Sequence, residues 1–171
     1  GLGGGSVSTN TAVGVSPLFS NSTGANSSAV GYAASYYQTG NSNSSFGHQA
    51  FQGQSGLSTG TNNTALGKDT LYSNTTGSYN IAVGEASLRS NTTASGSTAV
   101  GYQALYSNTA NYCTAIGNQA GYYNTGANNT YLGQGAGYNQ TSGTNNTFVG
   151  YNAGSNNSNN ACSYNTAVGM Q

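Results

Sequence analysis

The sequence predicts an all-β solenoid of about ten coils with a period near 17 residues. One observation is a four-residue phrase that recurs along the 171 residues: Thr or Ser, a small residue, an apolar residue, then Gly. The other is the composition, which is 2% charged, rich in Gly, Asn, Ser and Thr, and contains one Pro. A short, regular period along a whole chain is typical of stacked coils, each packed only against its neighbours.

The phrase occurs ten times, and we call its final residues the anchor glycines. They are Gly14, Gly31, Gly47, Gly67, Gly84, Gly101, Gly117, Gly133, Gly150 and Gly169. Successive anchors are 16 to 20 residues apart. The longest step places its extra residues in the region 52–58, where we expect a surface loop.

Each coil is expected to contain two short strands and two turns. A second Gly seven residues before most anchors permits a positive φ, and the Asn residues near it favour turns. The phrase itself has the period-two alternation of a strand. A second strand is expected three and four residues after the anchor, as at Thr70 and Leu71 or Ala104 and Leu105. At about 3.3 Å per residue, such a coil is too short to enclose a wide space and must be flattened.

Alternation separates the phrase into two faces. If the small residues point inward, the roll interior contains Ala12, Gly14, Ala29, Gly31, Ala65, Gly67, Ala82, Gly84, Ala99, Gly101, Ala115 and Gly117. The apolar residues then form an exposed row that needs a partner. This apolar row is Val13, Val30, Phe46, Leu66, Val83, Val100, Ile116, Leu132, Val149 and Val168. The opposite orientation, with the apolar row in the core of the coil, stays open.

Parallel stacking places equal positions of successive coils beside one another, which creates ladders of like side chains. Seven Asn residues occupy the position four before the anchor, where their amides can hydrogen-bond along the solenoid. A possible surface ladder five residues after the anchor contains Tyr36, Tyr72, Tyr106, Tyr122 and Tyr138. Its stacked rings can shield backbone hydrogen bonds, or they can form a sugar-binding platform.

Charge and residue content argue against several functions. A net charge of zero gives no electrostatic basis for binding nucleic acid, and no stretch of about 20 apolar residues suits membrane insertion. Lys68 and Glu85 are expected to pair on the surface. Because Asp69 and Glu85 are the only carboxylate side chains, polysaccharide hydrolysis is the least supported hypothesis. We expect no catalytic residues, no metal site and no cofactor.

The two cysteines are not expected to form a disulfide. Cys113 and Cys162 lie three coils apart, which corresponds to about 14 Å at the usual strand spacing. A disulfide requires α-carbons within roughly 7 Å.

The segments 10–14, 98–105 and 165–169, which all contain Thr-Ala-Val-Gly, resemble the head repeats of trimeric autotransporter adhesins of the YadA type. They look still more like the longer-period variant found in phage tail fibres and related surface proteins. The resemblance covers almost the whole chain. It implies a left-handed parallel β-roll filled by small residues, with apolar residues packing three chains around an axis. The period near 17 and the Thr or Ser three before the anchor depart from the adhesin pattern.

The resemblance implies a non-enzymatic structural and attachment protein, a segment of a trimeric viral tail fibre or a bacterial surface adhesin. Residues 1–171 would form a single repeat domain, a fragment of a longer fibre or adhesin. Its partners would be two further copies of itself and a host cell-surface glycan or protein, so its location would be extracellular. The alternative is an ice-binding monomeric solenoid that uses the Thr-x-Val array as a flat face.

Overall fold

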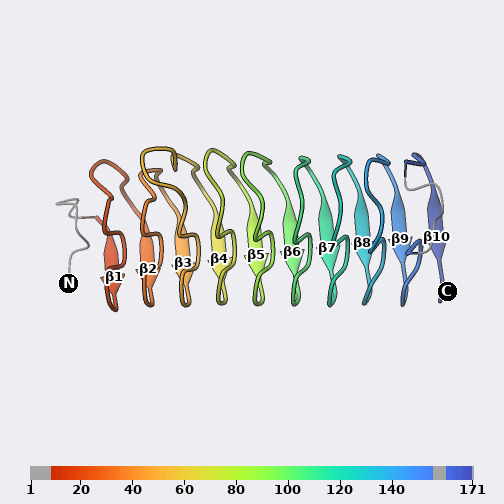
Figure 1. The fold of residues 1–171 in the computed structure, drawn as a ribbon, viewed down its shortest axis with the longest axis horizontal. Helices are drawn as coiled ribbons and strands as arrows, with labels where there is room; N and C mark the ends of the chain where they lie inside the picture. The colour runs from red at the N-terminus through yellow and green to blue at the C-terminus, as the bar shows by residue number, and fades with distance from the viewer. Residues whose placement is uncertain (1–8, 156–160, 171) are drawn as a thin grey trace.

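In the computed structural model, which describes residues 9–155 and 161–170, the chain winds into a parallel β-solenoid (Figure 1). Its ten strands of three residues are β1 (Thr11–Val13), β2 (Ser28–Val30), β3 (Ser44–Phe46), β4 (Thr64–Leu66), β5 (Ile81–Val83), β6 (Thr98–Val100), β7 (Thr114–Ile116), β8 (Thr130–Leu132), β9 (Thr147–Val149) and β10 (Thr166–Val168). They form one sheet in sequence order, so about nine turns separate the first strand from the last. The predicted all-β solenoid with a period near 17 is confirmed.

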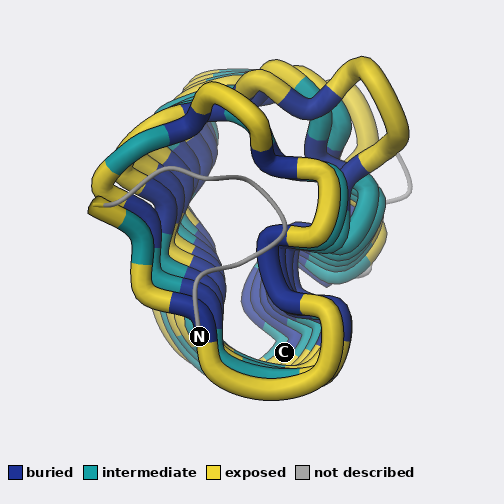
Figure 2. Tube along the Cα trace, turned by 90° about the vertical axis from the view of Figure 1, so that its left-hand side faces the viewer, coloured by how far each residue is buried: buried dark blue, intermediate teal, exposed yellow. Residues whose placement is uncertain are grey.

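The sheet is in register along its whole length. Every strand residue pairs with the equivalent residue of the next coil, as Thr98 does with Thr114 and Val100 with Ile116. The middle residue of each strand from β1 to β9 is buried, while its two neighbours are exposed or half-buried. Viewed along the axis, the coils lie behind one another around a common interior (Figure 2).

The expected second strand is absent from the described coils, and a turn takes its place. Gln103 and Leu105 have positive φ angles of 54° and 50°, a conformation that most side chains avoid. The Gln103 amide donates to Glu85 O in the preceding coil, whereas the Leu105 amide donates to Ala120 O in the following one. The turn therefore satisfies its backbone toward both neighbours and still buries the Leu105 side chain. Thr70 and Leu71 belong to the equivalent turn of an earlier coil.

The core is filled in two complementary ways. In β6 the strand contributes the small Ala99, and the turn of the same coil contributes the large Leu105. In β8 the strand contributes the buried Tyr131, and Gly137 occupies the position equivalent to Leu105. A Cβ on Gly137, or on Gly121 of the preceding coil, would collide with the Tyr131 ring, so this large side chain is accommodated by small residues beside it.

The buried Asn ladder joins side chains mainly to backbone. The Asn63 amide N–H donates to Asn43 Oδ1 at 2.9 Å, and the Asn80 N–H donates to Asn63 Oδ1 at the same distance. The Asn63 side chain also donates to Gly77 O at 3.0 Å in the following coil. Direct amide-to-amide bonding is secondary, as in the 3.3 Å bond from Asn63 Nδ2 to Asn43 Oδ1. Each buried Asn thus ties its own coil to the coils on both sides.

The alternation of side chains predicts that the anchor glycines lie in the roll interior, but the structure does not place them there. Gly14 is exposed, and Gly31, Gly67, Gly84, Gly101 and Gly117 are half-buried. Gly101 has φ +134°, and a Cβ there would lie 2.7 Å from the Gly117 carbonyl carbon. Glycine is needed because the backbones of adjacent coils approach one another closely along the axis, whereas the alanines of the phrase fill the interior.

Replacing an anchor glycine should therefore destabilise the stack. We expect Gly101→Ala to lower the free energy of unfolding by at least about 2 kcal/mol, through backbone strain and collision with Gly117. The control is Gly56→Ala, because Gly56 also has a positive φ but has open space around it, so its loss should be about 1 kcal/mol. Urea unfolding monitored by circular dichroism measures both. Equal losses would contradict the close-approach explanation.

The complementary filling of the core can be tested by moving the large side chain from the strand to the turn of one coil. We expect Tyr131→Ala to cost about 3–5 kcal/mol of unfolding free energy, because it leaves a ring-sized cavity. Adding Gly137→Leu should restore at least about 1 kcal/mol, since the coil then has the Ala and Leu pattern of β6. Thermal and urea unfolding of the two single variants and the double variant provide the coupling energy. Strictly additive losses would show that the two positions do not share one space.

Candidate functional site

The outer face of the sheet carries the apolar row. Phe46, Leu66, Ile116, Leu132, Val13 and Val168 are exposed, with exposed fractions from 41% at Phe46 to 77% at Val168. The remaining members, Val30, Val83, Val100 and Val149, are half-buried. In the single chain, the row therefore points away from the core. The interior instead receives the alanines of the phrase, with Ala12 at 5% exposure and Ala29, Ala65, Ala82, Ala99 and Ala115 at 0%.

A second row runs beside the apolar one on the same face. It contains the first residue of each strand: Thr11, Ser28, Ser44, Thr64, Ile81, Thr98, Thr114, Thr130, Thr147 and Thr166. These side chains are exposed or half-buried, and one of them, Ile81, is apolar. Because the strands are in register, the two rows form a grid spaced by about 4.8 Å along the axis and about 7 Å along each strand.

The residues five after the anchor form a stack of planar side chains on another side of the coil. The Tyr106 and Tyr122 rings are parallel within 1° at 4.9 Å, and the Tyr122 and Tyr138 rings are 5.2 Å apart. The Arg89 guanidinium extends the stack, 4.9 Å from the centre of the Tyr72 ring and 5.9 Å from that of Tyr106. Rings that face one another offer their edges to solvent, so the continuous part of the stack is a poor sugar platform.

Two members of this stack were missed from the sequence because only tyrosines were considered. Phe19 occupies the same position and stacks on Tyr36 at 4.8 Å, and Arg89 occupies it between Tyr72 and Tyr106. The shared position, rather than the residue type, was the available signal. Burial raises the pKa of Tyr122, and nearby tyrosines add to the shift.

Four ionisable side chains, those of His48, Lys68, Asp69 and Glu85, lie close together. Lys68 Nζ lies 3.2 Å from Glu85 Oε1 and 3.9 Å from Asp69 Oδ2, while His48 Nδ1 lies 3.9 Å from Asp69 Oδ1. The His48 ring stacks on Tyr32 at 5.1 Å. An exposed ion pair such as Lys68–Glu85 contributes at most about 1 kcal/mol. Within residues 9–155 and 161–170, no three His, Cys, Asp or Glu side chains gather as a metal ion would require.

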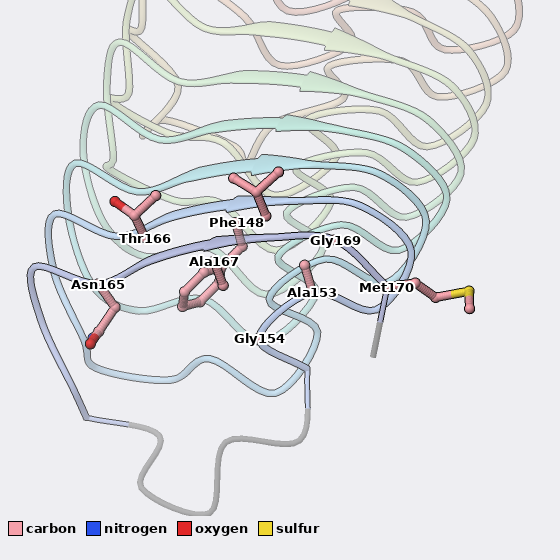
Figure 3. A pocket seen from close by; sticks show the side chains of 9 residues that line it. Phe148, Ala153, Gly154, Asn165, Thr166, Ala167, Gly169 and Met170 are labelled. Carbon is pink, nitrogen blue, oxygen red and sulfur yellow. The ribbon is translucent and has the colours of Figure 1, made fainter.

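A hollow of about 470 Å³ lies beside β10 (Figure 3). Its lining includes Phe148, Ala153, Ala167 and Met170 and has no titratable side chain. Asn165 and Thr166 also line it, so the hollow at the last described coil is partly apolar and partly polar. No helix in the described part of the chain has the length and apolar content to cross a bilayer.

The two free thiols should differ in reactivity. Cys113 is buried, its Sγ donates to Gly126 O at 3.2 Å, and burial raises its pKa, whereas Cys162 is half-buried. A raised pKa lowers the thiolate fraction at any given pH, and the thiolate is the reactive form. We expect a thiol-reactive dye to label Cys162 in the native protein and Cys113 only after unfolding, as mass spectrometry can show. Labelling of both thiols at equal rates would contradict the buried position of Cys113.

Comparisons with protein-family models, with curated proteins and with solved structures found no match to this chain. The exposed rows and the ring stack are therefore the features from which a function can be inferred.

Proposed function

We propose that the chain is a non-enzymatic structural and attachment protein, a segment of a homotrimeric fibre on a virion tail or a bacterial surface. The observation that carries this proposal is the apolar row, which runs along the outer face of all ten strands. Large exposed apolar patches normally mark contacts with another molecule. A second copy lying parallel and in register would meet the row with an identical row at every coil.

The energetics favour such an assembly. Each half-exposed Val, Leu or Ile that becomes buried contributes about 1 kcal/mol, and the row repeats this contribution in every coil. Three copies around an axis parallel to the solenoid would bury all three rows and leave none exposed. The threefold symmetry, like the left-handed roll, is taken from the resemblance to adhesin and tail-fibre head repeats. The Thr and Ser hydroxyls would lie at the margin of the interface, where they can keep contact with water.

Attachment would use the surfaces that remain exposed. In a trimer, every exposed turn would be presented three times, so weak contacts with a host glycan or protein would add through effective concentration. This role requires no reaction at the protein surface and places the molecule outside the cell.

Ice binding is a second candidate because of one specific observation, the in-register Thr row beside the apolar row. This flat, regular grid of methyl and hydroxyl groups suits an ordered water surface. A monomer would be required, since a trimer interface would cover the same face.

The two candidates predict different behaviour in solution. We expect sedimentation equilibrium to give three times the chain mass, and Val100→Lys combined with Ile116→Lys to yield monomers, because the charges would be buried at the interface. Thr93→Lys is the matched control, since Thr93 is exposed on a turn away from the sheet and should leave the trimer intact. A stable wild-type monomer at micromolar concentration would overturn the trimer. If that monomer also shows thermal hysteresis, ice binding becomes the better assignment.

A further inference from the structure

The ring stack is interrupted in the coil that begins with β3. Gln52 stands at the ladder position there, with Tyr36 in the coil before and Tyr72 in the coil after. Phe19 stacks on one face of Tyr36, and Arg89 packs on one face of Tyr72. Among the described residues, no parallel ring or cation is stacked on the other face of either tyrosine. Two coil spacings, about 10 Å, separate Tyr36 from Tyr72, and the shorter Gln52 side chain occupies the position where one more ring would complete the stack.

The same coil contains the longest step between anchors. Residues 54–57 form an extra turn that begins two residues after Gln52 and follows β3 (Figure 1). Leu57 on this turn is exposed. The base of the turn is well fixed, because Gln54 N donates to Ser58 Oγ at 2.6 Å. Gly53 is required beside it, since a Cβ would come within 2.6 Å of Gln38 Nε2. The missing ring and the inserted turn thus coincide in one coil.

The side chains around this gap could bind a small polar ligand. The Gln52 side chain is half-buried, and its amide makes no hydrogen bond to the described part of the chain, so a donor and an acceptor are available. A Gln side chain is shorter than a Tyr side chain, so the outer parts of the two flanking rings extend beyond it. Tyr37, which meets Tyr36 edge-on at 4.6 Å, adds a further ring at this end of the stack.

We propose that Tyr36, Gln52 and Tyr72 form a binding site for one ring of a neutral saccharide. The C–H faces of a sugar ring pack on the negative faces of aromatic rings, and its hydroxyl groups need both donors and acceptors, which the Gln52 amide supplies. The ladder positions of this site carry no charge on the side that faces the gap, since Arg89 lies beyond Tyr72. A nucleotide is a poorer fit, because its phosphates would need cations, and Arg89 lies beyond Tyr72, where it packs on the Tyr72 and Tyr106 rings.

The inference names the partner class for the proposed attachment role and rests on that role. The position of Gln52 is better suited to a sugar ring than the continuous part of the stack is. Between Tyr106 and Tyr138 the rings cover one another. At Gln52 the ladder instead carries an amide that makes no hydrogen bond to the described residues, with Tyr36 in the coil before and Tyr72 in the coil after. In a trimer the site would occur three times.

Filling the gap tests the proposal. Saturation-transfer NMR of the chain with neutral oligosaccharides of glucose, galactose, mannose and N-acetylglucosamine should detect binding to the wild type. We expect Gln52→Tyr to weaken that binding at least about tenfold, because the new ring completes the stack. The control Arg89→Tyr also adds a ring to the ladder but outside the gap, so it should retain affinity within about twofold. Circular dichroism shows whether each variant is folded.

A second variant keeps the test decisive if Gln52→Tyr fails to fold. Gln52→Ala preserves the gap but removes the amide, and it too should lose at least about tenfold in affinity. Absence of binding by the wild type to the whole panel, or equal affinity in a folded Gln52→Tyr or Gln52→Ala variant, would overturn the site. Sedimentation of the same samples separates the two ideas. A trimer that binds no sugar refutes the site alone, and a monomer that binds sugar refutes the trimer alone.

Discussion

The close approach of backbones at the anchor glycines is the constraint on which the rest of the structure depends. At Gly101 a side chain would meet the carbonyl group of Gly117, so coils can stack at this corner only where glycine recurs in register. Once the register is set, every residue of a coil lies beside the equivalent residue of the next coil. The Asn amides can then bind the neighbouring backbone, planar side chains can stack, and the two outer rows of the sheet become straight.

The division between inside and outside follows from the alternation along each strand and from what fills the interior. In the coil of β6 the strand contributes Ala and the turn a larger residue, whereas at Tyr131 the strand contributes an aromatic ring and the turn contributes Gly. The branched residues of the phrase point the other way and line the outer face. The exposed apolar row thus follows from the alternation of side chains along each strand, and it is the surface that the proposed assembly would bury.

The solenoid, its strand positions and their register could be inferred from the sequence, because they follow directly from a repeated phrase. The prediction of a second strand in each coil was wrong, because Gln103 and Leu105 adopt positive φ angles, which residue type alone does not reveal. Alternation separates two faces but cannot tell an interior glycine from one at a close axial contact, so Gly101 was misplaced. The gap at Gln52 was visible in principle, since that coil lacks the ladder tyrosine and also carries the insertion. The proposed role of this gap became visible only when the structure placed the rings of the neighbouring coils on both sides of it.

The central functional claim is that the apolar face of the sheet meets two identical faces. Electron cryomicroscopy of the purified chain, with images averaged along the solenoid axis, tests it most directly. The proposal predicts a three-lobed cross-section in which the sheet faces meet at the centre and the turns lie outside. A single-lobed cross-section with the sheet face in solvent would contradict it.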